Sequence, residues 1–440
     1  MKILLQTVGT GGGDAHPVWE ALKFTVDATK PDLLVQICSE KTFHETVPKF
    51  KLLFDSGETL PETEYLILES YDDFECIRSQ IKEKLNELIS QHAEASIEGD
   101  YTSGTKAMSS AIMSTLLECG ATQLHCGVGE RDETGRATST EKLVSFSTAD
   151  IFAERMLPEF GRMFNKQQFT AVRQQSKVFA DQVQNKELTQ SLTALRSISC
   201  CCEHWNRFDY KQAHNAFRNG VRRNIEVLKA TGWDKNQLDK NNEHLSKCKE
   251  QLFSISRCVD LLLNAERCIT RGYYDDAISR LYRLVELVVQ VRFFTYRNDV
   301  PTSQNPTKNI PISWLNEHTP HLAKKKSHST QFNKISLASN DAVDALKELG
   351  DGLGSFIENQ WWKDKKLKEK GPLGKLLERR NDSYLAHGSV TVPKEVADNM
   401  FLLVNDIVIK LAEVQNVDFL SIREGATMPI FPSKLLRSLK

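Results

Sequence analysis

The chain has 440 residues, of which 40% are hydrophobic and 26% are charged, and 57 lysines and arginines stand against 58 aspartates and glutamates, a net charge of -1. This composition is globular and excludes a disordered or collagen-like chain. The length suits two or three domains that each bury a core. No run of about 18 apolar residues occurs, so we expect a soluble, cytoplasmic protein with no membrane partner.

Residues 2–147 alternate short apolar runs with amphipathic stretches. The expected strands are Lys2–Val8, Asp32–Cys38, Glu64–Leu68, Ser96–Tyr101, Thr122–Val128 and Leu143–Ser147, and the expected helices lie near 16–29, 41–54, 73–92 and 105–119. Strands separated by such helices predict βαβ units and a mainly parallel, doubly wound sheet, that is, an α/β Rossmann-like N-terminal domain. Ligands bind beyond the carboxyl ends of strands in such sheets, which selects the loops after the first and fourth strands.

The first strand runs into the glycine-rich loop Thr7-Val8-Gly9-Thr10-Gly11-Gly12-Gly13-Asp14. Glycine lets backbone N–H groups come close to a phosphate or a ribose. Gly9 and Gly11 fit the start of a GxGxxG fingerprint, but Asp14 occupies its third glycine position. A nicotinamide-dependent oxidoreductase, with Glu40 as the ribose partner, is therefore an alternative that lacks a catalytic constellation. A plain tight turn is the other alternative.

The fourth strand runs into Asp100-Tyr101-Thr102-Ser103-Gly104-Thr105-Lys106-Ala107-Met108-Ser109, where hydroxyl groups, one glycine and one lysine precede an apolar helix. This segment is not a P-loop, because GxxxxGK[ST] is absent. A helix N-terminus with serine or threonine caps and a nearby lysine still makes an anion site. The alternative is simple capping by Ser103 or Thr105, with Lys106 in solvent.

Taken together, the loop after the first strand and the D-[YT]-[TS]-[GS]-G-T-K-x-M-S pattern after the fourth resemble the CARF domain of CRISPR-associated type III effectors. The resemblance implies a homodimer that binds a cyclic oligoadenylate, tetra- or hexa-adenylate, across its two-fold axis as an allosteric activator. Thr10 and Gly11 would contact the ring, while Ser103, Gly104, Thr105 and Lys106 would cradle phosphate and ribose. Ser103 stands where glycine is common in the family.

After about residue 150 the apolar residues recur at spacings of three and four, most clearly in 277–291 and 396–411. This period predicts an all-α C-terminal region. Two polar stretches interrupt it, 298–330 and the lysine-rich 363–370.

Ten cysteines are spread along the chain without a CxxC pair, which favours reduced thiols. The metal-like cluster consists of Cys200, Cys201, Cys202, His204 and His214. Adjacent cysteines on a helix point in different directions, and no second Cys/His pair lies at zinc-finger spacing. We therefore expect buried thiols in this cluster and no bound metal.

Near the end of the chain, Arg380, Asn381 and His387 lie within the segment ERRNDSYLAHG, residues 378–388. On an unbroken helix Arg380 and His387 would be separated by roughly 10 Å of rise, so either the backbone bends or two copies of the motif meet across a dimer. Arginine suits the charge that develops on phosphorus, and histidine suits proton transfer near neutral pH, which is the chemistry of RNA cleavage. A chance pairing at the end of a surface helix is the alternative.

The pattern R-N-x-S-x-x-A-H-G resembles the R-x(4–6)-H signature of HEPN ribonucleases, and residues 272–287 look like the helix that packs beside it. A polar stripe on that helix contains Arg283 and Glu286, which would either support the active site or form a solvated face. The expected domains are a CARF-like ligand-sensing domain at 1–150, a helical connector at 151–260 and a HEPN-like ribonuclease domain at 261–440.

This resemblance implies a metal-independent endoribonuclease of type III CRISPR antiviral defence, without a cofactor, that cleaves single-stranded RNA and leaves 2′,3′-cyclic phosphates. His387 would serve as general acid or base, Arg380 would stabilise the transition state and Asn381 would orient RNA or its neighbours. Two alternatives stay open. One is a non-catalytic sensor that signals to a partner through its helical domain, and the other is a CARF-like half that also degrades its activator.

The net charge of -1 is a cancellation between the two halves. Residues 1–150 carry 13 Lys+Arg against 25 Asp+Glu, whereas residues 151–440 carry 44 against 33. A basic helical half suits an RNA-handling domain. The acidic half must bind an anion through local donors, which points to Lys106 and the loop backbones.

Overall fold

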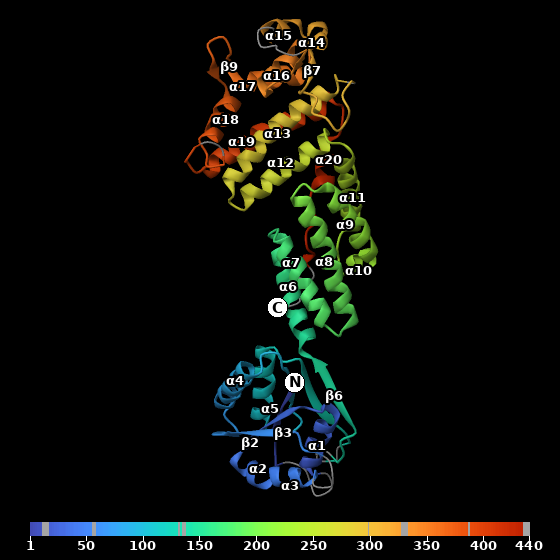
Figure 1. The fold of residues 1–440 in the computed structure, drawn as a ribbon, viewed down its shortest axis with the longest axis vertical. Helices are drawn as coiled ribbons and strands as arrows, with labels where there is room; N and C mark the ends of the chain where they lie inside the picture. Colours follow the sequence, from blue (N-terminus) through green and yellow to red (C-terminus); the bar gives the residue numbers. More distant parts are fainter. Residues whose placement is uncertain are drawn as a thin grey trace. The chain divides into compact units, whose positions relative to one another are not determined.

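The computed structural model describes residues 1–10, 17–54, 59–130, 133, 138–297, 299–326, 333–385 and 388–433. These residues divide into two compact units (Figure 1). The first unit consists of 1–159 and 177–192, and the second consists of 160–176 and the described chain from Thr193 onward.

Six strands form the sheet of the first unit. They are β1 (Lys2–Val8), β2 (Leu33–Ser39), β3 (Glu62–Leu68), β4 (Ser96–Asp100), β5 (Gln123–Val128) and β6 (Lys142–Ser147). Their order in the sheet is β3-β2-β1-β4-β5-β6, and every pair is parallel except β5 with β6. The predicted strands and the α/β Rossmann-like fold are confirmed.

Helices cover both faces of this sheet, which explains why β1 and β2 are buried along almost their whole length. On one face lie α1 (Val18–Thr29), α2 (Glu40–Glu45) and α3 (Val47–Leu52), and on the other lie α4 (Phe74–Gln91) and α5 (Lys106–Cys119) (Figure 1). Leu4 faces the first group and its neighbours Ile3 and Leu5 face the second. The single helix predicted at 41–54 is divided, because Pro48 lacks an N–H and stands in the first turn of α3.

Three helices contribute residues to both units, namely α6 (Thr148–Asn165), α7 (Phe169–Gln182) and α8 (Lys186–Asn206). The second unit continues with α9 (Tyr210–Ala216), a π-helical turn (Phe217–Val221), a 3₁₀ turn (Arg222–Asn224), α10 (Ile225–Ala230), α11 (Lys235–Glu250), α12 (Ile255–Thr270), α13 (Tyr274–Phe294), α14 (Ile312–His318), α15 (Pro320–Lys326), α16 (Ser339–Glu348), α17 (Gly352–Trp361), α18 (Pro372–Asn381), α19 (Lys394–Val414) and α20 (Phe419–Ala426).

The core of the second unit lies where α12, α13 and α19 pack against one another (Figure 1). The apolar stripes expected in 277–291 and 396–411 supply buried residues such as Leu284, Val288 and Val404. The predicted helical character of this region is confirmed. Two short antiparallel pairs that the sequence did not reveal accompany the helices, β7 (Ile310–Pro311) with β8 (Lys334–Ile335) and β9 (Trp362–Asp364) with β10 (Glu369–Lys370).

The three cysteines of the metal-like cluster lie on α8. Cys201 and Cys202 are buried there, and burial raises the pKa of the Cys202 thiol to about 12. All ten cysteines are free thiols. Within the part of the chain that the structure describes, no group of three or more His, Cys, Asp or Glu side chains is placed to hold a metal ion. No helix of the described segments has the length and apolar character that a membrane span requires.

Candidate functional sites

The loops after β1 and β4 lie side by side, because these strands are neighbours at the point where the strand order reverses. Gly9 N donates to Ser103 Oγ (3.1 Å), and Ser103 Oγ donates to Thr7 O (2.6 Å). A Cβ atom on Gly9 would lie 2.5 Å from Gly104 N, so the first loop tolerates only glycine there. Gly104 has a φ of +100°, a conformation that favours glycine. The loops after β1 and β4 are therefore packed against each other and held together by hydrogen bonds.

The second loop leads directly into α5. Thr105 Oγ1 caps this helix by accepting from Met108 N (3.1 Å) and donates to Tyr71 O (2.5 Å). Lys106, the first residue of α5, is exposed, and its ammonium group has no hydrogen-bond or ion-pair partner among the described residues. Thr10 is exposed at the end of the first loop, and Gly11 lies outside the described residues. This edge of the sheet thus offers Thr10, Lys106 and the N-terminus of α5 to an anion.

Asp100, to which the sequence analysis assigned no role, holds the start of the second loop through hydrogen bonds to Thr102. It is fully buried and accepts from Gln6 Nε2 (2.9 Å), Thr102 N (2.8 Å) and the Thr102 hydroxyl. Burial raises the pKa of the Asp100 carboxyl above its ordinary value. Thr102 Oγ1 in turn accepts from Gly127 N (2.7 Å) on β5. The sequence did contain a signal for this role of Asp100, namely a carboxylate at the end of an apolar strand with a threonine two residues later.

In the second unit, α18 ends at Asn381 and the backbone then turns. Gly388 N donates to Ser383 O (3.2 Å), and Ser383 is buried and donates through Oγ to Arg380 O (2.7 Å). The first alternative from the sequence, a bend in the backbone, is therefore what the structure contains. His387 lies outside the described residues.

The Arg380 guanidinium stacks on the ring of Tyr282 from α13, with its carbon 4.4 Å from the ring centroid. Its Nη1 lies 3.3 Å from Asn381 Oδ1, and its Nε is buried with no hydrogen-bond partner among the described residues. No carboxylate in the described part of the chain forms an ion pair with Arg380. The side chain thus holds a positive charge and unused donors at the end of α18, which is suited to an anionic ligand.

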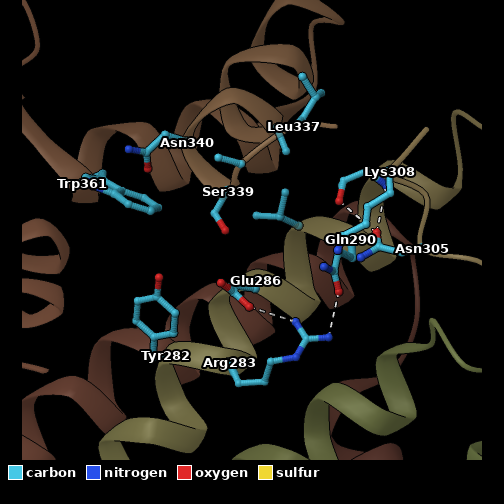
Figure 2. A pocket seen from close by; sticks show the side chains of 14 residues that line it. Tyr282, Arg283, Glu286, Gln290, Asn305, Lys308, Leu337, Ser339, Asn340 and Trp361 are labelled. Atoms are coloured by element: carbon cyan, nitrogen blue, oxygen red, sulfur yellow. Dashed lines mark hydrogen bonds and ion pairs between the residues drawn. The ribbon is translucent and has the colours of Figure 1, made fainter. Parts of the chain in front are cut away.

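A pocket of about 520 Å³ lies along α13 beside Tyr282 (Figure 2). Arg283 and Glu286, the two predicted supporting residues, both line it. Arg283 donates through Nη1 to Glu286 Oε2 (3.3 Å) and through Nη2 to Gln290 Oε1 (2.9 Å). The structure thus brings Arg283 and Glu286 together at the pocket. Arg380 does not line the pocket, but its guanidinium lies over the ring of Tyr282, which does.

Part of the second unit matches a known protein family. Residues 247–415, which include Arg380 and the pocket residues, match the family model of the Csm6 HEPN domain. The chain is similar in structure to Enterococcus italicus Csm6 bound to cyclic hexa-2'-fluoro-hexa-dAMP, with a TM-score of 0.59 and 13% identity over 100% of this chain and 98% of that one. At that identity the likeness shows the fold. A search of curated proteins by sequence finds no match.

These matches confirm the resemblance inferred from the two sequence motifs. The α/β sheet with its two joined loops and the helical region that follows are both parts of the similar structure. Residues 247–415 therefore match the Csm6 HEPN domain, and the chain as a whole has a fold similar to that of Enterococcus italicus Csm6.

Proposed function

We propose that the protein is an endoribonuclease that cleaves single-stranded RNA without a metal ion and is switched on by a cyclic oligoadenylate. The observation that carries this proposal is the Arg380 guanidinium at the end of α18, which lies over Tyr282 without a carboxylate partner among the described residues, inside the segment that matches a HEPN domain. His387 immediately precedes Gly388 in the chain. The Gly388 N–H donates a hydrogen bond to Ser383 O, and the Ser383 hydroxyl donates one to Arg380 O. This succession of contacts supports a shared site for Arg380 and His387.

In the proposed reaction, the 2′-oxygen beside the scissile phosphate forms a bond to phosphorus while the bond from phosphorus to the 5′-oxygen breaks. His387 takes the proton of the 2′-hydroxyl or gives one to the leaving oxygen. Arg380 stabilises the charge on the non-bridging oxygens, and Asn381, which accepts from Arg380, orients the guanidinium or the RNA. The products are a 2′,3′-cyclic phosphate and a 5′-hydroxyl. Two protomers of a homodimer would border one cleft with both motifs.

The proposed activator site is the joined pair of loops after β1 and β4. The Enterococcus italicus protein carries a cyclic hexanucleotide, which supports a ligand of this class. The hydroxyls of Ser103 and Thr105 donate to backbone carbonyls, so these residues and Gly104 would shape the loop. Thr10, Gly11, Lys106 and the loop N–H groups would then contact the ring. Because the first half is acidic, this binding depends on local donors.

An RNA reporter assay tests the proposal. The full-length chain is incubated with a fluorescent single-stranded RNA, with cyclic tetra- or hexa-adenylate, and with EDTA. We expect cleavage with one of the two rings only, unchanged by EDTA, and 2′,3′-cyclic phosphate ends by mass spectrometry. If neither ring produces cleavage, the ribonuclease is excluded and the non-catalytic sensor is favoured.

Gly388 provides a separate test of the turn beyond α18. A Cβ atom at this position would lie 1.9 Å from Asp382 O, so Gly388→Ala must open the turn. We expect a loss of about 1–3 kcal/mol in unfolding free energy, as in an overpacked core, and a drop of about tenfold or more in the cleavage rate. Ser389→Ala, an exposed neighbour, is the control and should change neither. Wild-type rates in Gly388→Ala would show that the turn does not position the site.

A further inference from the structure

We propose that the pocket beside Tyr282 is a nucleobase subsite of the RNA substrate and that it selects guanine. The assignment rests on the proposed ribonuclease function and adds the substrate feature that the enzyme reads. Three features of the pocket support the assignment, namely its aromatic walls, its contact with Arg380 through Tyr282 and the acceptor group inside it.

The walls of the pocket have the chemistry of a site for a single-stranded base. Tyr282 on α13 and Trp361 at the end of α17 both line it, and the rest of the lining mixes polar and aliphatic side chains (Figure 2). Unstacked RNA bases bind by stacking on aromatic rings and by hydrogen bonds to their exposed edges. The volume of about 520 Å³ lies in the range of pockets that enclose small ligands.

The position of the pocket relates it to the scissile phosphate. Tyr282 lines the pocket and also carries the Arg380 guanidinium 4.4 Å from its ring centroid. A phosphate bound at Arg380 therefore has its adjoining nucleoside at Tyr282. On the opposite wall, the exposed Lys308 has no side-chain partner among the described residues and is available to the next phosphate. The pocket would thus take the base of a nucleotide that flanks the cleaved bond.

Glu286 determines which base fits. Figure 2 shows its carboxylate and the Ser339 hydroxyl pointing toward one another from α13 and α16. Arg283 donates to Oε2 of this carboxylate and to Gln290 Oε1, which holds the side chain in place. An ionised carboxylate only accepts hydrogen bonds. Guanine alone presents two adjacent donors on its Watson–Crick edge, N1–H and the N2 amino group, whereas adenine, cytosine and uracil each place an acceptor beside their donor.

The first experiment measures base preference in the activated full-length chain. The substrates are 2′-O-methyl oligonucleotides with one ribonucleotide, and the nucleotide on either side of the cleavable bond is varied among G, A, C and U. We expect guanine at one of these positions to raise kcat/KM about tenfold or more, as good base contacts do. Glu286→Gln should reduce that ratio about tenfold, because glutamine directs a donor at the guanine donors. Glu243→Gln, an exposed residue on α11, is the matched control and should keep the ratio.

The second experiment measures nucleotide binding to the pocket in a chain that lacks the catalytic histidine. The His387→Ala chain is titrated with the four nucleoside 3′-monophosphates while tryptophan fluorescence is recorded. Guanosine monophosphate should quench the signal most strongly, and an added Trp361→Phe substitution should remove that quenching.

The two experiments distinguish failure of the guanine subsite from failure of the proposed ribonuclease function. Selective quenching by guanosine monophosphate in the His387→Ala chain, together with no RNA cleavage by the activated wild-type chain, would retain the subsite and overturn the ribonuclease. Cleavage without base preference, a pyrimidine preference, or a Glu286→Gln ratio equal to wild type would overturn the guanine subsite and leave the ribonuclease standing.

Discussion

Replacing Arg380 or His387 by alanine is expected to lower activator-dependent RNA cleavage by roughly 10²–10⁴-fold. Arg380 is the group that meets the charge on phosphorus in the proposed mechanism, and it has no competing carboxylate in the described part of the chain. Its side chain lies against Tyr282, so the guanidinium is positioned before RNA arrives. Initial rates at saturating activator measure the effect, and the affinity for the cyclic oligoadenylate should not change.

The neighbouring Arg379 makes a matched control for this prediction. It stands on the same last turn of α18 but is exposed, so Arg379→Ala should keep the rate within a few-fold of wild type. Arg380→Lys separates charge from shape, because lysine keeps the charge but loses the planar fork that stacks on the ring. We expect an intermediate rate from it. Full activity in either Arg380→Ala or His387→Ala would refute the assignment of the site.

The fold was predictable because its signals are local. The apolar runs of β1 and β2 are long since helices cover both faces of the sheet, and the helices between them have the length that βαβ units require. The rule that ligands bind beyond the carboxyl ends of the strands then selected the two loops that the structure joins. Pro48 was a visible signal for the break between α2 and α3 that the prediction of one helix overlooked.

The details of the sites were not predictable, because they depend on contacts between distant residues. Gly9 touches Gly104 across the loops, and Arg380 stacks on Tyr282 from another helix. Neither contact leaves a periodic pattern in a single sequence. The pocket beside Tyr282 escaped prediction for the same reason, since Trp361 lies on a helix far along the chain. The motifs identified the chemistry, and tertiary packing determined which side chains share a site.

The second large effect is expected from Lys106→Glu. Lys106 stands at the first position of α5, exposed and unpartnered among the described residues, beside loops whose hydroxyls mostly bind their own backbone. Residues 1–150 carry a net negative charge, so a cyclic anion would find few other cations there. Loss of a charge-assisted hydrogen bond costs about 1.5–3 kcal/mol, which corresponds to roughly a 10–100-fold higher activator concentration for half-maximal cleavage.

The experiment compares the activator dose response of Lys106→Glu with that of Lys30→Glu. Lys30 is also exposed, but it precedes β2 and therefore lies at the opposite edge of the parallel sheet from the two loops. Both variants change the net charge by the same amount, so a long-range field effect would shift both curves equally. A shift confined to Lys106→Glu, with the rate at saturating activator recovered, locates the anion contact at α5. Equal shifts would show that the activator responds to the overall charge of the first half and that Lys106 makes no specific contact.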